Sequence, residues 1–116
     1  YSGDDGLTLA FLAYGGSGVI GVATHWSAPE HQAMITAFTK GDVALARKYN
    51  DILLESYAFE TGDDNPNPIP SKVMMNHLGF KVGDCRLPMG PPPAGLADRA
   101  AVVHANLQKA REALSK

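Results

Sequence analysis

The sequence predicts an α/β protein, formed by the end of an α/β barrel and an all-helical extension, so that the chain itself is mostly helical. Residues 19–24 form a short, mostly apolar run, which is typical of a strand covered on both faces, and residues 1–5 resemble the end of another strand. About five further segments have helical spacing. The order of strand, helix, strand, helix and then only helices fits the end of a barrel, and an open doubly wound sheet is the structural alternative.

The first helix is expected directly after residues 1–5. Asp4 or Asp5 can accept hydrogen bonds from the free amides of its first turn. Apolar side chains then recur at helical spacing until Gly15 and Gly16, which can adopt the left-handed geometry that ends a helix. The apolar strand 19–24 follows these glycines.

Two longer helices are predicted next. Ser27 can cap the first of them, because Pro29 tolerates a missing amide in a first turn and Glu30 stands at the capping-box position. This helix should run to about Gly41, and Asp42 can cap the following one. The apolar stripe of that second helix consists of Leu45, Tyr49, Ile52, Leu53 and Tyr57.

The second half of the chain changes composition at a proline-rich loop over residues 61–70. A short helix is predicted over 70–78, ended by Gly79, and residues 80–93 contain too many prolines for a helix and should form an extended strap over other elements. A long amphipathic helix should end the chain. Its stripe consists of Leu96, Ala100, Val103, Leu107, Ala110 and Leu114.

This order of elements predicts two parts, with the last β/α units of a barrel in residues 1–41 and a helical domain with the strap in residues 42–116. A single strand leaves its backbone groups unpaired and needs neighbours on both sides. We therefore expect that an N-terminal barrel portion outside this chain supplies the rest of the sheet.

Composition excludes several classes of partner. Ten Lys and Arg residues stand against twelve Asp and Glu residues with no basic run, so neither nucleic acid nor an anionic membrane surface is expected as a partner. No apolar run reaches transmembrane length and no leader pattern is present. The single Cys85 cannot form an internal disulfide, which fits a reducing compartment and predicts a cytoplasmic protein.

The run Gly16-Ser17-Gly18-Val19-Ile20-Gly21 matches the spacing of a dinucleotide-binding glycine loop. In that motif the glycines follow a strand and open a helix, so that the phosphates meet the positive end of the helix. Here the predicted order is reversed, because the glycines close a helix and open a strand. A nucleotide site is therefore not predicted.

The remaining candidates for chemistry favour structural roles. The two carboxylate pairs, Asp4-Asp5 and Asp63-Asp64, fit a helix cap and a turn better than a cation site. Lys72 falls in the first turn of a helix and is interpreted as structural rather than catalytic. No metal site is predicted, because metal-ligand spacing is absent from the four histidines His25, His31, His77 and His104. His25 stands at the end of the predicted strand, where barrel enzymes place active groups, although a packing or rim role is favoured.

Several motifs together resemble the C-terminal portion of the dihydrodipicolinate synthase family of pyruvate-dependent class I aldolases. They are, in order, Ser2-Gly3-Asp4-Asp5, the run from Gly15 to Ile20, Asn67-Pro68-Ile69-Pro70 with Lys72, and Arg86-Leu87-Pro88-Met89. The resemblance covers the whole chain and implies a (β/α)8 barrel with a C-terminal helical domain, in a homotetramer. It also implies a lyase that condenses pyruvate with aspartate semialdehyde to 4-hydroxy-tetrahydrodipicolinate, in lysine and diaminopimelate biosynthesis.

In this family pyruvate is held as a Schiff base on a lysine, without a cofactor, and the resemblance places that lysine and the proton relay outside this chain. No catalytic residue is therefore expected here, and the chain alone should be inactive. Three substrate contacts carry over by position. The resemblance implies that the Ile20 carbonyl faces the pyruvate-derived group, that Gly3 lies at the pocket wall, and that Asn67 reaches toward the second substrate.

Two alternatives stay open. The first motifs are shared with other pyruvate aldolases, such as N-acetylneuraminate lyase and keto-deoxy sugar aldolases, and Gly21 and His25 depart from residues common in the synthases. The apolar stripe of the last helix is also compatible with a non-catalytic helical interaction module.

Overall fold

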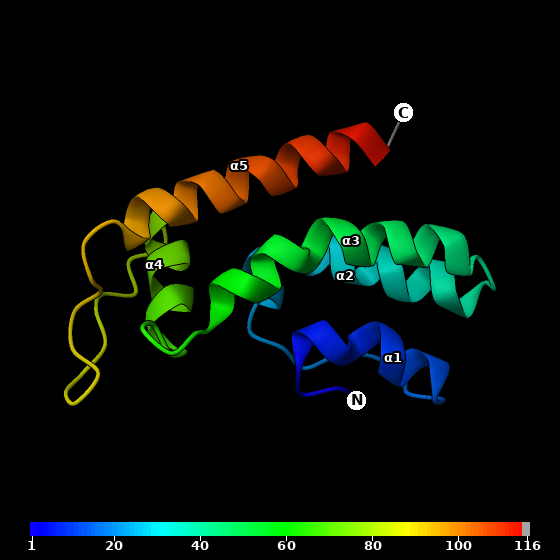
Figure 1. The fold of residues 1–116 in the computed structure, drawn as a ribbon, viewed down its shortest axis with the longest axis horizontal. Coiled ribbons are helices and arrows are strands. Elements are labelled where there is room, and N and C mark those ends of the chain that lie inside the picture. The colour runs from blue at the N-terminus through cyan, green and yellow to red at the C-terminus, as the bar shows by residue number, and fades with distance from the viewer. Residues whose placement is uncertain (115–116) are drawn as a thin grey trace.

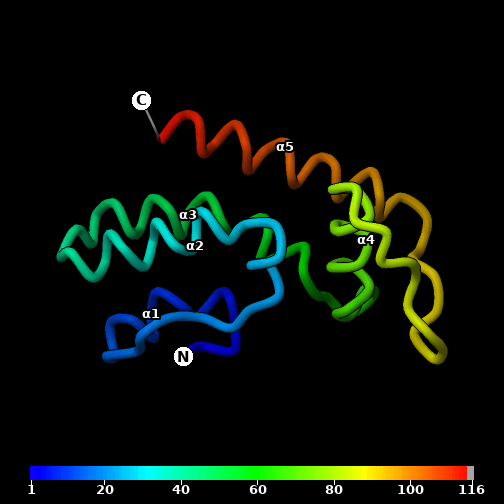
Figure 2. Tube along the Cα trace, turned by 180° about the vertical axis from the view of Figure 1, so that it is seen from behind, coloured from blue at the N-terminus to red at the C-terminus, as the bar shows by residue number. Residues whose placement is uncertain are grey.

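The computed structural model describes residues 1–114 and consists of helices joined by loops (Figure 1). A short 3-10 helix, η1 (Asp5–Leu7), leads into α1. The α-helices are α1 (Thr8–Ala13), α2 (Thr24–Thr39), α3 (Val43–Glu60), α4 (Ile69–His77) and α5 (Leu96–Leu114). Helices α2 and α3 lie side by side, with α1 along one side of this pair and α5 along another, while α4 packs against the first part of α5 (Figures 1 and 2).

The predicted strand over residues 19–24 is wrong in its extent. In the described part of the chain, β-pairing there is a single parallel bridge between Ser2 and Val19. The Ser2 amide donates to the Gly18 carbonyl at 2.8 Å, and the Ile20 amide donates to the Ser2 carbonyl at 2.9 Å. A strand needs a neighbouring backbone along its whole length, and only the segment around Ser2 lies beside this one. Beyond Val19 the chain turns instead into α2, which begins at Thr24.

The pair formed by α2 and α3 follows the predicted signals closely. Ser27 has non-helical backbone angles (φ −123°, ψ 23°), so that one turn from Thr24 precedes the break and Pro29 lies in the first turn after it. The predicted side-chain cap is not formed, because the Ser27 hydroxyl donates to the Ala23 carbonyl at 2.7 Å. The helix ends two residues before Gly41, whose φ of +83° suits a residue without a side chain. Asp42 caps α3 as predicted, since its Oδ1 accepts a hydrogen bond from the Leu45 amide at 2.9 Å.

The core lies between α2, α3, α4 and α5. Trp26 meets Phe59 edge to face with ring centroids 6.0 Å apart, and its indole N–H donates to the Ser56 hydroxyl at 3.1 Å. The predicted stripe of α5 faces this core from Leu96 to Leu107, while Ala110 and Leu114 are half-buried. The buried apolar residues are Ala23, Trp26, Met34, Ala37, Ala46, Leu53, Phe59, Ile69, Val73, Met74, Leu96, Ala100, Val103 and Leu107. Because α3 and α4 cover the stripe, the chain itself supplies the surface that α5 needs.

The predicted short helix is confirmed, and the strap is free of helix as predicted, but it projects beyond α4 and α5 instead of lying over other elements (Figures 1 and 2). Helix α4 is followed by Gly79 with a φ of +92°, and residues 80–93 contain neither helix nor strand. The Lys72 ammonium donates to the carbonyls of Val82 and Asp84 at 3.2 and 2.9 Å, which ties the strap to α4. These bonds support the structural interpretation of Lys72. The division into two parts, residues 1–41 and residues 42–116, stays a prediction. Helix α2 belongs to the first part and α3 to the second, and these two helices pack along each other.

Candidate functional site

Two of the predicted substrate contacts are brought together by the bridge between Ser2 and Val19. Gly3 directly follows Ser2, and Ile20 directly follows Val19. Ile20 is 76% exposed, and a Cβ added at Gly3 would have no atom within 4 Å, so both positions face open space. Their assignment as substrate contacts stays a prediction.

Asn67, the third predicted contact, lies in the loop between α3 and α4. Its Oδ1 accepts a hydrogen bond from the Ser71 hydroxyl at 3.0 Å, and its amide N–H faces the Thr61 hydroxyl at 3.4 Å. Ser71 thus gives the exposed side chain a fixed partner in the first turn of α4.

Two buried carboxylates converge on the start of α2. Asp5 Oδ2 accepts a hydrogen bond from the Val22 amide at 2.6 Å, and Glu60 Oε2 accepts one from the Ala23 amide at 2.9 Å. The first amides of a helix have no partner inside the helix, and the positive end of the helix dipole favours an anion there. Asp5 and Glu60 are 1% and 8% exposed, so these two carboxylates replace water at the helix start.

His31 completes this buried cluster from about two turns further along α2. Its Nδ1 lies 2.9 Å from the Ser27 carbonyl oxygen, and since a carbonyl only accepts, we assign the hydrogen to Nδ1. Its Nε2 then lies 3.4 Å from Asp5 Oδ1 and forms an ion pair with it when the ring is doubly protonated. The ring also packs on Tyr57, with centroids 5.7 Å apart.

Burial and mutual repulsion separate the two carboxyls in pKa. Burial alone would raise the pKa of Asp5, but the adjacent His31 ring and the Val22 amide hold it below its usual value. Burial first, and the charge of Asp5 second, raise the pKa of Glu60 to about 7. Burial, followed by the charges of Asp5 and Glu60, also raises the pKa of Tyr57, which therefore stays neutral. At neutral pH the cluster is thus close to the point where it loses one proton.

The predicted cap role of Asp5 is wrong, because its side chain reaches across to Val22 instead of the first turn of its own helix, and Asp4 makes no side-chain cap either. Gly21 is the local reason, since a Cβ at that position would lie 2.1 Å from Asp5 Oδ1. The glycine run also ends α1 as predicted, with Gly15 at a φ of +89°. In the sequence, the acidic pair Asp4-Asp5 and the small residue Gly21 were the features that could have indicated this cluster. The residues next to Glu60 and His31 in sequence do not indicate it.

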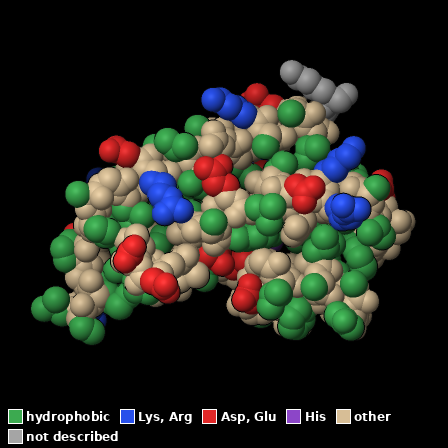
Figure 3. All heavy atoms as spheres, in the orientation of Figure 1, with side chains coloured by type: hydrophobic (Ala, Val, Ile, Leu, Met, Phe, Trp, Pro, Cys, Tyr) green, Lys and Arg blue, Asp and Glu red, His purple; other side chains and the backbone are tan. Residues whose placement is uncertain are grey.

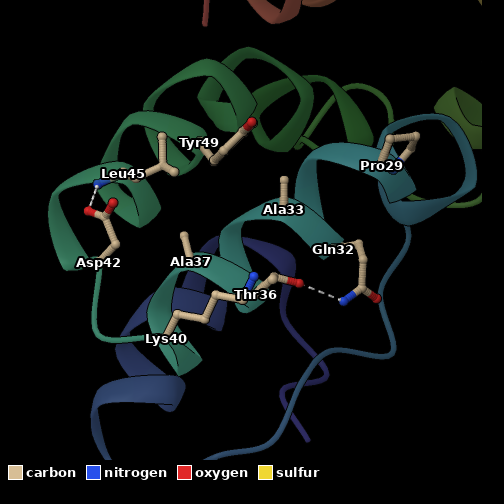
Figure 4. Close-up of a pocket in the computed structure, with 9 residues that line it drawn as sticks. All are labelled: Pro29, Gln32, Ala33, Thr36, Ala37, Lys40, Asp42, Leu45 and Tyr49. Atoms are coloured by element: carbon tan, nitrogen blue, oxygen red, sulfur yellow. Dashed lines mark hydrogen bonds between the residues drawn. The ribbon is translucent and has the colours of Figure 1, made fainter. Parts of the chain in front are cut away.

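The other candidates lie apart from this cluster. His25 is exposed, with its Nδ1 2.8 Å from the Val22 carbonyl oxygen, and it lines a cavity of about 190 Å³ with Ser71, Lys72, Met75 and Val82. A larger cavity of about 410 Å³ lies between α2 and the first turns of α3 (Figure 4). Within residues 1–114, no cluster of three or more His, Cys, Asp or Glu side chains could hold a metal ion, and no helix is long and apolar enough to span a membrane.

Comparison with known proteins assigns the chain. Residues 1–108 match the model of the dihydrodipicolinate synthetase family. The chain belongs to this family. A 4-hydroxy-tetrahydrodipicolinate synthase of Listeria monocytogenes is 43% identical over 118 aligned positions, which cover all of this chain and 36% of that protein. The synthase of Synechococcus elongatus is 44% identical over 94 positions, which cover 81% of this chain and 31% of that protein. The chain therefore spans about a third of the length of these relatives.

Solved structures of the family confirm the predicted fold class. The synthase of Cyanidioschyzon merolae, solved with lysine bound, superimposes with a TM-score of 0.83 and 34% identity over 93% of this chain and 36% of its own. The synthase of Methylacidiphilum fumariolicum superimposes with a TM-score of 0.86 at 24% identity, over 98% of this chain and 37% of its own, and that likeness shows the fold alone. The helices described above are thus the barrel end and helical extension of this family.

Proposed function

We propose that the chain is the C-terminal part of a longer 4-hydroxy-tetrahydrodipicolinate synthase. The longer protein would condense pyruvate with aspartate semialdehyde in lysine and diaminopimelate biosynthesis. The observation that carries the proposal is the 43% identity that extends across the whole chain to synthases about three times its length. We also propose that the longer protein is cytoplasmic and that it forms a homotetramer.

In the proposed reaction, pyruvate forms a Schiff base with a lysine outside this chain, and no cofactor is needed. Lys72 is not that lysine in the proposal, because its ammonium is held by two carbonyls of the strap. The chain contributes binding groups instead. The Ile20 carbonyl would face the pyruvate-derived group, Gly3 would leave room at the pocket wall, and Asn67 would reach the aldehyde substrate. The open space at Gly3 and the exposure of Ile20 support these roles.

Borohydride trapping tests the proposal directly. The full-length product of the gene, incubated with pyruvate and reduced, should gain one stable adduct on a lysine outside residues 1–116, located by peptide mass spectrometry. Turnover with aspartate semialdehyde should then exceed turnover with N-acetylmannosamine or with sugar-derived aldehydes. A full-length protein that gains no adduct would exclude the proposal, and a preference for a sugar aldehyde would move the protein to another branch of the pyruvate aldolases.

A further inference from the structure

The buried carboxyl cluster joins the segments of Gly3 and Ile20 to the end of α3, which leads into the loop that carries Asn67. Asp5 follows Gly3 by two residues, and Val22, whose amide it binds, follows Ile20 by two residues. Glu60 is the last residue of α3 and directly precedes the loop that carries Asn67. The pair therefore binds the backbone that follows Ile20, and its two members belong to the segments that carry Gly3 and lead to Asn67.

The two hydrogen bonds hold the segment between Ile20 and α2 from two directions. Asp5 approaches it from η1 and Glu60 from the end of α3, and they bind the adjacent amides of Val22 and Ala23. These bonds join residues 17 and 37 positions apart in the chain. Two carboxylates that are both charged repel each other strongly in a buried site, so the placement of this segment depends on the ionisation of the two carboxyls.

We propose that Asp5 and Glu60 are positioning residues for substrate binding, and that a single proton on this carboxyl pair keeps the segments of Gly3, Ile20 and Asn67 in register. This inference rests on the proposed function. With the proton in place, the pair carries one negative charge, which the positive end of α2 can balance. Without this proton, the two buried carboxylates repel each other, and the repulsion pushes η1 and the end of α3 apart.

The surroundings of Glu60 set where that proton is lost. The charged and titratable groups around the pair are Asp4 and Asp5 from the N-terminal segment, Tyr57 from α3, and His31 from α2, which lies against Asp5. Burial and the charge of Asp5 raise the pKa of Glu60 to about 7. The register of the three segments should therefore change near neutral pH, with tighter substrate binding on the acidic side.

The first test observes the proton without any enzymatic reaction. In the full-length protein labelled with 15N-alanine, the Ala23 amide resonance should shift with a midpoint near the pKa of Glu60, about 7. Glu60→Gln keeps a side-chain oxygen for this amide and cannot ionise, so its Ala23 resonance should stay constant. Glu55→Gln makes the same change on the exposed part of α3, where Glu55 accepts from Asn106, and should titrate like wild type. An Ala23 resonance that does not titrate in wild type, or titrates equally in Glu60→Gln, overturns the inference.

The second test separates positioning from a merely structural role. In wild type the KM for aspartate semialdehyde should rise by roughly 3–10-fold as pH passes upward through the pKa of Glu60, with a smaller change in kcat. Glu60→Gln resembles the protonated state and should keep the low KM on both sides of neutrality, while Asp5→Asn should raise KM at every pH. A Glu60→Gln variant whose KM rises with pH as in wild type contradicts positioning. If pyruvate trapping fails, the proposed function is wrong, whereas the Ala23 titration stands or falls independently of it.

Discussion

Gly21 is the residue that makes room for the buried carboxylate of Asp5. A Cβ at this position would lie 2.1 Å from Asp5 Oδ1 and 2.4 Å from its Cγ, which is far inside van der Waals contact. Gly21→Ala should therefore displace Asp5 from the Val22 amide and lower the free energy of unfolding by about 1–3 kcal/mol. Gly62→Ala is the matched control, because a Cβ there would meet no atom within 4 Å. Urea unfolding of both variants checks this, and equal stabilities would contradict it.

Glu60→Gln should change stability in a pH-dependent direction. The pKa of Glu60 is raised from 4.5 to about 7 in the folded protein, chiefly by burial. The folded state thus binds this proton more tightly than the unfolded chain, and the resulting stability is full below about pH 4.5 and lost as the pH rises through about 7. Above neutrality the variant should exceed wild type by about 1–3 kcal/mol in free energy of unfolding, and at acid pH the difference should vanish. Chemical unfolding at several pH values, with Glu55→Gln as control, measures it, and a pH-independent difference would refute it.

At the scale of elements, the start of α3 depends on one cap. Asp42 Oδ1 accepts from the Leu45 amide at 2.9 Å, and no further side chain is assigned to this helix start. Asp42→Ala should destabilise the protein by about 1 kcal/mol. Asp51→Ala changes an exposed residue inside the same helix and should be neutral or slightly stabilising, because alanine favours a helix interior. Thermal unfolding distinguishes the two, and equal losses would show that capping is not the cause.

The strap should depend on Lys72 in a similar way. Its ammonium binds two strap carbonyls, and the Asn76 side chain also binds the strap through Gly83 and Val82. Lys72→Ala should speed amide hydrogen exchange across residues 80–85 by roughly tenfold, because each lost hydrogen bond contributes about 1 kcal/mol. Exchange in Lys109→Ala, on the exposed face of α5, should match wild type. Unchanged exchange in the strap of Lys72→Ala would contradict a tethering role.

The elements that could be predicted from sequence are those specified locally. The cap at Asp42 and the glycine after α4 each act within one turn of helix, and each is found where expected. The predicted strand failed because its pairing depends on backbone outside the segment. The cluster of Asp5 and Glu60 escaped prediction for the same reason, since its hydrogen bonds link residues 17 and 37 positions apart.

At the scale of the whole molecule, the helices around the core bury their apolar stripes, whereas the N-terminal layer does not. Leu7, Phe11 and Tyr14 are 49%, 44% and 93% exposed, and Figure 3 shows apolar side chains gathered over α1. Ile20 adds a further exposed apolar side chain close to the bridge. Since apolar patches on isolated proteins favour association, this layer fits a surface that the rest of a barrel covers in the family.

Residues 1–116, expressed alone, should therefore self-associate and show no condensation activity. Phe11→Ser together with Leu7→Ser removes apolar surface from this layer and should shift the chain toward monomer on size-exclusion chromatography. Leu54→Ser, on α3 and 53% exposed, is the matched control and should leave the association unchanged. In the full-length protein, by contrast, we expect the rest of the barrel to bury these two side chains, and the same two changes should then destabilise the fold. If residues 1–116 instead elute as a monomer and melt cooperatively, the chain is an autonomous helical module. If residues 1–116 alone catalyse the condensation, the catalytic lysine does not lie outside this chain.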